Sequence, residues 1–159
     1  MERALEPFEG KHLPQHGDVL LRQTNDDGDI AIVNGVVEMT GGFETSVYLS
    51  LFGGNVDDDG RRDNPNGWWG NLLETDSKFR YVSRTQNLLG SLPLNSANVI
   101  RIKRAAEADL EWFTREDVAS SVEVAVSLPG LNRVNISGSI FAEGEEFRFS
   151  FTENWKAAA

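Results

Sequence analysis

The stretch that decides the fold is SVEVAVSLPGLNRVNISGSIFAEGEEFRFSFT, residues 121–152. Apolar and polar residues alternate along three segments of it, and short turns containing glycine separate the segments. Side chains of a β-strand point alternately to the two faces of a sheet, so each segment presents one apolar face. The pattern therefore predicts a three-stranded antiparallel sheet. Its apolar face is predicted to carry Val122, Val124, Val126, Leu128, Val134, Ile136, Ile140, Phe147, Phe149 and Phe151.

The preceding stretch, NSANVIRIKRAAEADLEWF at residues 95–113, has the periodicity of an amphipathic helix. Asn95 and Ser96 are residue types that cap a helix N-terminus, and Lys103 and Glu107 have the spacing of an i,i+4 ion pair. We expect this long central helix to cover the apolar face of the sheet, which gives an α+β fold. The apolar stripe of the helix consists of Val99, Ile102, Ala106, Leu110 and Phe113.

Two shorter elements are predicted nearer the N-terminus. Asn34-Gly35 separates the β-forming runs IAIV and VVEM, and this dipeptide is typical of the two-residue turn of a β-hairpin. The segment TGGFETSVYLSLFGG then changes to helical periodicity. It predicts a short amphipathic helix, with Thr40 as its cap and Gly53-Gly54 as its end.

The domain organisation follows from these elements. Residues 1–17 are polar, contain two prolines and show no periodicity, so we expect an extended N-terminal arm. Residues 18–155 are expected to form a single α+β domain, and residues 156–159 a disordered tail. No internal repeat or low-complexity tract divides the chain.

Composition excludes several classes of function. The chain has no cysteine, so it has neither a disulfide frame nor a thiol nucleophile. Its net charge of −10 disfavours binding to nucleic acid, because phosphate backbones would be repelled. No apolar run is long enough to span a membrane, and the first 17 residues lack a signal-peptide pattern.

Candidate sites for chemistry are few. His12 and His16 lie in the N-terminal arm with Pro14 between them, so a solvated arm is expected rather than a metal site. The acidic run from Asn55 resembles a calcium loop but has Asn66 where a bidentate glutamate is required. We therefore predict no catalytic residue, no metal and no cofactor, and a protein that is not an enzyme. A calcium-dependent binding module is an alternative.

The stretch NGWWGN, residues 66–71, places two tryptophans in a glycine-rich loop that also contains Arg61 and Arg62. Tryptophan and arginine are enriched at the energetic centres of protein interfaces, so the four residues form a candidate partner interface. An alternative of equal weight is that Trp68 and Trp69 pack on their own domain. We expect one to face the domain and the other a neighbour. A third interpretation is a glycan-binding or peptidoglycan-hydrolysing domain that stacks sugars on the tryptophans.

Four stretches together carry a resemblance to a known family. They are DGDIAIVNG, GGFETSVYLSLFGG, GRRDNPNGWWGN and LGSLPLNSANVIRIKRAAEADLEWF, in that order. The series resembles the phage Mu-like tail baseplate proteins, which are related to the lysozyme-like baseplate wedge proteins, or sheath initiators, of contractile tails. The resemblance covers residues 18–155.

The resemblance implies a non-enzymatic structural subunit of the virion, placed in the inner baseplate after assembly in the host cytoplasm. Expected partners are other baseplate wedge proteins, the tail sheath protein, and tail tube or hub proteins, with multiple copies, six in our expectation. In such relatives, strands from sheath subunits extend the C-terminal sheet. Carried onto this chain, the strand-accepting residues are Glu146, Phe147, Arg148, Phe149, Ser150 and Phe151, with Ser121–Leu128 as a second candidate.

Overall fold

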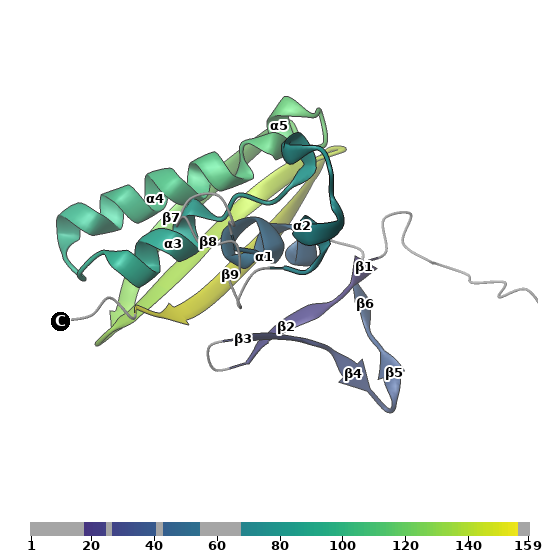
Figure 1. Cartoon of the computed structure of the whole chain (residues 1–159), viewed down its shortest axis with the longest axis horizontal. Coiled ribbons are helices and arrows are strands. Elements are labelled where there is room, and N and C mark those ends of the chain that lie inside the picture. Colours follow the sequence, from purple (N-terminus) through teal and green to yellow (C-terminus); the bar gives the residue numbers. More distant parts are fainter. Residues whose placement is uncertain (1–17, 25–26, 41–42, 55–67, 156–159) are drawn as a thin grey trace, which may run out of the picture.

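The structure is a computed structural model that describes residues 18–24, 27–40, 43–54 and 68–155. It is an α+β fold in which helices lie on one face of a C-terminal antiparallel sheet, and short strands project to one side (Figure 1). The predicted N-terminal arm, the tail after Trp155, both histidines, the acidic loop, and Arg61 with Arg62 lie outside the described residues.

The predicted three-stranded sheet is present, with its strands in the order β7-β8-β9. Its strands are β7 (Ser121–Gly130), β8 (Arg133–Ala142) and β9 (Glu145–Asn154). Two-residue turns join them, and Asn132, Glu143 and Gly144 in these turns have positive φ angles. One prediction about this sheet is wrong: Leu128 is exposed, because the β7–β8 register shifts between Ser127 and Gly130.

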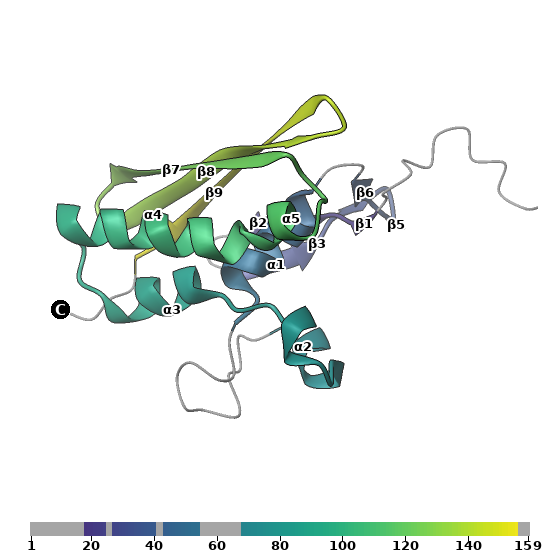
Figure 2. The same ribbon diagram turned by 90° about the horizontal axis from the view of Figure 1, so that it is seen from above.

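The long central helix is also confirmed, as α4 (Ser96–Leu110) followed by the short α5 (Trp112–Arg115). The Asn95 side chain accepts a hydrogen bond from the backbone N–H of Asn98 at 2.9 Å, so Asn95 caps the helix as predicted. Lys103 and Glu107 form the expected ion pair, at 3.1 Å. Figure 2 shows α4 lying along one face of the sheet, with the other face left uncovered by the elements drawn.

The core forms where the apolar stripe of α4 meets the apolar face of the sheet. Its aromatic side chains interlock through edge-to-face contacts, such as that between Phe43 and Phe147, whose ring centroids lie 5.0 Å apart. Trp155, just after β9, donates from its indole N–H to the carbonyl of Leu92 and so ties the end of the sheet to the helical layer. The fully buried large side chains are Phe113, Leu51, Ile102, Leu110, Ile136, Ile140, Val47 and Val134.

Four short elements complete the helical layer, and they precede α4 in the chain. They are α1 (Glu44–Phe52), α2 (Gly70–Leu73), the 3₁₀ helix η1 (Ser77–Phe79) and α3 (Arg84–Ser91). Helix α1 ends at Gly53 as predicted, but Thr40 does not cap it. Thr40 belongs to a strand, and Phe43 occupies the cap position without a side-chain hydrogen bond.

The N-terminal hairpin is confirmed, with Asn34 and Gly35 at φ angles of 52° and 78°. It is one arm of a larger unit in which three short antiparallel ribbons meet, hereafter the three-ribbon unit. The ribbons pair β1 with β6, β2 with β3, and β4 with β5. The strands are β1 (Asp18–Val19), β2 (Leu21–Thr24), β3 (Asp27–Ile30), β4 (Ile32–Val33), β5 (Val36–Val37) and β6 (Met39–Thr40).

A closed ring of backbone hydrogen bonds holds the three ribbons together at their meeting point. Leu20 donates to the carbonyl of Glu38, Glu38 to Ala31, and Ala31 to Leu20, at 2.8 to 2.9 Å. Ala31 is buried at this junction. Thr45 of α1 joins the unit to the body, because its hydroxyl donates to the carbonyl of Val19.

Candidate partner-binding surfaces

The strand β9 lies at one edge of the sheet, and its register shows which backbone groups face outward. Trp155 donates its N–H to the carbonyl of Asn132 at 2.7 Å, one step beyond the last paired residues of β8 and β9. Antiparallel pairs alternate between those that exchange hydrogen bonds and those that do not. The N–H and C=O groups of Glu146, Arg148 and Ser150 therefore point away from β8, to the outside of the sheet.

The six predicted strand-accepting residues thus divide into two sets. Phe149 and Phe151 are buried and Phe147 is partly buried in the core, so these three position the strand. The other three are exposed, and their backbone groups point outward at the edge of the sheet. Within the described part of the chain, no strand pairs with the outer side of β9. This edge meets the geometric requirement for accepting a strand.

An ion pair lies along this edge. The Arg148 guanidinium binds the Glu146 carboxylate in a bidentate manner at 3.0 and 3.1 Å, and Ser139 donates to the same carboxylate at 2.7 Å. The hydrogen bond from Arg148 is the main reason why the pKa of Glu146 is lowered. Charged side chains on an edge strand deter unspecific pairing, so a partner strand would have to accommodate this pair.

The two tryptophans of the loop have different surroundings. Trp68 is partly buried, and its ring meets that of Tyr81 edge-on at 5.5 Å. Its backbone N–H donates to the carbonyl of Gly53 at 2.6 Å. Trp69 is 66% exposed. Trp68 therefore faces its own domain, as we expected of one of the two tryptophans. The contact of Trp69 with a neighbouring protein stays a prediction.

Neighbouring residues fix this arrangement. The ring of Trp68 covers Gly70, where an added Cβ atom would lie 2.1 Å from the indole, so a larger residue at that position would displace the Trp68 ring. Asn71 is buried and its side chain exchanges two hydrogen bonds with the backbone of Tyr81, at 2.9 and 3.1 Å. Residues 68–71 therefore form a local fold that presents Trp69 outward.

Trp69 is followed in the sequence by exposed apolar residues that sequence reasoning missed. Leu72 and Leu73 of α2 and Phe79 of η1 are all largely exposed. We call Trp69, Leu72, Leu73 and Phe79 the Trp69 patch. Exposed apolar residues clustered in one segment are typical of protein contacts rather than of a solvated loop. In the sequence, the two adjacent leucines directly after GWWGN were the signal that could have predicted this apolar surface.

The three-ribbon unit is a second apolar surface that the sequence analysis did not identify as a site. In the β4–β5 hairpin, Ile32 lies opposite Val37 and Val33 opposite Val36, so both faces of the hairpin are apolar. All four side chains are exposed, together with Ile30 and Met39. A two-stranded hairpin is marginally stable in water, and one with two apolar faces gains from burial against another molecule.

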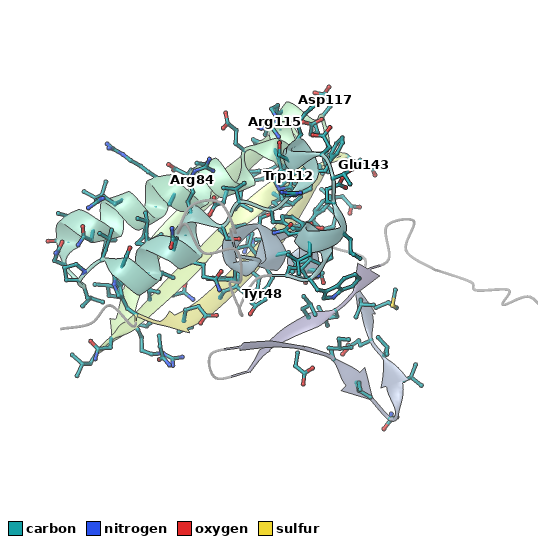
Figure 3. All side chains as sticks on the ribbon, viewed as in Figure 1. Tyr48, Arg84, Trp112, Arg115, Asp117 and Glu143 are labelled. Carbon is teal, nitrogen blue, oxygen red and sulfur yellow. The ribbon has the colours of Figure 1, made fainter. Side chains whose placement is uncertain are left out.

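Asp109 is a buried acid whose titration is governed mainly by its burial. Its side chain is fully buried in α4, and its two carboxylate oxygens accept the backbone N–H groups of Arg84 and Thr85 at 3.1 and 2.8 Å. Arg84, labelled in Figure 3, lies 3.5 Å from it at the start of α3. Burial raises the pKa of Asp109 to about 6, although these hydrogen bonds lower it. Asp109 thus caps α3 from a neighbouring helix.

The raised pKa of Asp109 predicts a dependence of stability on pH. Between pH 4 and 6 the unfolded chain has lost this proton while the native chain retains it. The contribution of Asp109 to the free energy of unfolding should then fall by about 3 kcal/mol as the pH rises through this window. Asp109→Asn removes the titration. Urea unfolding of both chains from pH 4 to 7 should show wild type losing stability relative to the variant; parallel curves would contradict the assignment.

Within the described residues, no three histidine, aspartate or glutamate side chains gather to hold a metal ion. No helix in the same part of the chain is long and apolar enough to cross a membrane. The described surface offers the exposed edges of the C-terminal sheet and two exposed apolar areas.

Comparison with known families identifies the class as phage proteins. The chain belongs to the family of phage protein GP46, whose model matches residues 43–146. The match runs from the residue before α1 to the second residue of β9, so it includes the Trp69 patch and α4. No curated protein and no solved structure matches the chain.

Proposed function

We propose that this phage protein is a structural subunit of a contractile tail baseplate, an inner wedge protein that initiates the sheath. Several copies surround the tail tube in the virion. Each copy contacts neighbouring wedge proteins through exposed apolar side chains and offers its C-terminal sheet to the first ring of sheath subunits.

The observation that carries this proposal is the outer edge of β9. Glu146, Arg148 and Ser150 direct their backbone groups away from the sheet, and the strand is held rigidly from behind by Phe149 and Phe151. Strand addition to such an edge forms many main-chain hydrogen bonds in one defined geometry. A rigid edge of this kind suits a template, because it fixes the orientation of the strand that follows.

The apolar areas support a role inside an assembly. The Trp69 patch and the β4–β5 hairpin expose large side chains that a solitary domain has little reason to keep. The net charge of −10 keeps the free subunit soluble before assembly despite these areas. Membership of a phage protein family is consistent with a component of the virion.

A proline at Arg148 tests the strand-accepting role of β9. The Arg148 N–H points outward, so Arg148→Pro removes an edge donor without breaking a bond to β8. Arg148→Ala is the matched control, since it also loses the pair with Glu146. We expect Arg148→Pro, but not Arg148→Ala, to abolish sheath polymerisation on reconstituted baseplates seen by electron microscopy. Normal sheath on the folded proline variant would reject β9 as the template.

The Trp69 patch predicts separate effects for the two tryptophans. Trp69→Ala removes an exposed ring, so the free energy of unfolding should change by less than about 0.5 kcal/mol while binding to co-expressed wedge proteins weakens. Trp68→Ala removes the contact with Tyr81 and should lower thermal stability. Co-purification and thermal unfolding measure the two effects. Full wedge assembly by a folded Trp69→Ala chain would exclude the interface.

The second candidate function is a glycan-binding or peptidoglycan-hydrolysing domain, which the exposed Trp69 ring favours because aromatic faces stack on sugars. Incubation with purified peptidoglycan distinguishes the two functions. Release of soluble fragments that depends on a carboxylate of this chain would replace the structural proposal, as would retention of wild type but not Trp69→Ala on the glycan.

A further inference from the structure

The opposite edge of the sheet, β7, also directs backbone groups outward. Gly138 pairs with Phe149 and belongs to the hydrogen-bonded series of β8 with β9, so the residues on either side of it face β7. These residues, Ser137 and Ser139, pair with Ala125 and Glu123 of β7, whose N–H and C=O groups therefore point toward β8. The N–H and C=O groups of Val122, Val124 and Val126 therefore point away from the sheet. Within the described residues, β8 is the only strand that pairs with β7.

A groove runs beside this edge, between β7 and the C-terminal half of α4. Its volume is about 360 Å³. Leu110 and Val124 are buried and form an apolar floor, and Ala108 leaves room on the helix. The residues that line it are Glu107, Ala108, Leu110, Glu111, Thr114, Val122 and Val124. A strand added to β7 would point every second side chain into this groove, because alternate side chains of a strand face the helical layer.

The charges of the groove define the side chains it accepts. Both charged residues that line it, Glu107 and Glu111, are acidic and exposed. Lys103 pairs with Glu107 at 3.1 Å, and no ion pair involves Glu111 among the described residues. The only charged residue of β7 itself, Glu123, is also acidic. Lysine and arginine suit such a site because the aliphatic stem covers apolar surface while the charged end reaches a carboxylate.

We propose that β7 and this groove form a binding site for an extended protein segment with lysine or arginine at alternate positions. The segment adds to β7 as a fourth strand through the outward groups of Val122, Val124 and Val126. Its basic side chains cross the apolar floor and pair with Glu107 and Glu111. The inference rests on the proposed growth of the sheet by added strands, and it names the chemistry of a partner at the edge opposite β9.

The two edges differ in how selectively they can bind. The Glu146–Arg148 pair at β9 is internally neutral, whereas the β7 groove has an excess of negative charge. Backbone hydrogen bonds are the same for every sequence, so selectivity has to come from the side chains beside the edge. The usable length of β7 ends at Ser127, where the register shifts.

A short fluorescent peptide of alternating threonine and arginine is the probe. Fluorescence anisotropy with the full chain should show binding, and Glu107→Gln with Glu111→Gln should weaken it about tenfold through loss of the paired charges. The control is Glu143→Gln with Glu145→Gln, which removes the same charge from the β8–β9 turn and should leave binding unchanged. Equal weakening in both double variants, or no binding to wild type, would overturn the proposal.

N-methylated peptides test the strand geometry. An added strand directs alternate amides to β7 and the others to solvent. Methylating one alternate set should abolish binding, and methylating the other should have little effect. Equal tolerance of both sets would mean that the peptide does not bind as a strand. Normal sheath on the Arg148→Pro variant, together with peptide binding as expected, would reject the sheath proposal alone. Blocked sheath on that variant, together with no peptide binding, would reject the β7 site alone.

Discussion

Gly138→Ala is expected to unfold the C-terminal sheet or to destabilise it severely. A Cβ atom at this position would lie 1.9 Å from the carbonyl oxygen of Glu123 on β7 and 2.7 Å from the ring of Phe149 on β9. The oxygen belongs to the backbone of a paired strand, so it cannot rotate away as a flexible side chain would. We expect a loss of at least about 3 kcal/mol in the free energy of unfolding, at the upper end of overpacking effects.

Gly90→Ala is the matched control, because it makes the same chemical change in a different setting. Gly90 lies in α3, and nothing lies within 4 Å of the position that its Cβ would occupy. Alanine should stabilise this helix by up to about 1 kcal/mol. Urea unfolding followed by tryptophan fluorescence measures both. Similar stability of the two variants would show that β8 can shift to accept a side chain, contrary to the packing described.

Phe113→Ala is expected to have the second large effect on stability. Phe113 is 0% exposed, its ring stacks on Trp112 at a centroid distance of 4.0 Å, and Phe43 meets it edge-on at 5.5 Å. Its backbone carbonyl also accepts the N–H groups of Val118 and Ala119, which lead into β7. Truncation leaves a cavity between α5 and the sheet and should cost about 3 to 5 kcal/mol in the free energy of unfolding.

Phe79→Ala removes the same ring from the Trp69 patch, where Phe79 is 68% exposed. Its effect on unfolding should stay within about 0.5 kcal/mol, but co-purification with wedge proteins should weaken. The variants Phe113→Ala and Phe79→Ala thus distinguish a ring that stabilises the fold from a ring that is available to a partner. A stable Phe79→Ala chain with full assembly would remove Phe79 from the proposed contact, and a mild effect of Phe113→Ala would contradict its place in the core.

Local periodicity was enough to predict the sheet and the long helix. Val122 and Val124 alternate with neighbours that are polar or small, and Ile102 and Ala106 recur at helical spacing. These patterns predict which face of each element is buried. Asn95 and the Asn34-Gly35 dipeptide marked a helix start and a turn because their backbone preferences are local. Local preference misled at Thr40, a good capping residue that the structure uses in strand pairing instead.

The candidate sites were predicted less completely, because their properties depend on residues far apart in the sequence. Alternation placed Phe147, Phe149 and Phe151 on one face, but it could not say that the groove lies beside the other edge, at β7. That groove exists because α4 ends over Val122 and Val124. The raised pKa of Asp109 likewise comes from the start of α3, which chain folding brings to it.

The sequence by itself determined the α+β class, the order of the main elements and the buried faces of α4 and the sheet. These follow from periodicities of a few residues, which neighbouring side chains impose on the backbone. Only the tertiary structure decided that Trp68 turns inward against Tyr81 while Trp69 remains exposed, and that three ribbons meet at Ala31. Two adjacent tryptophans have the same local preferences, so their different environments are set by packing with residues distant in the chain.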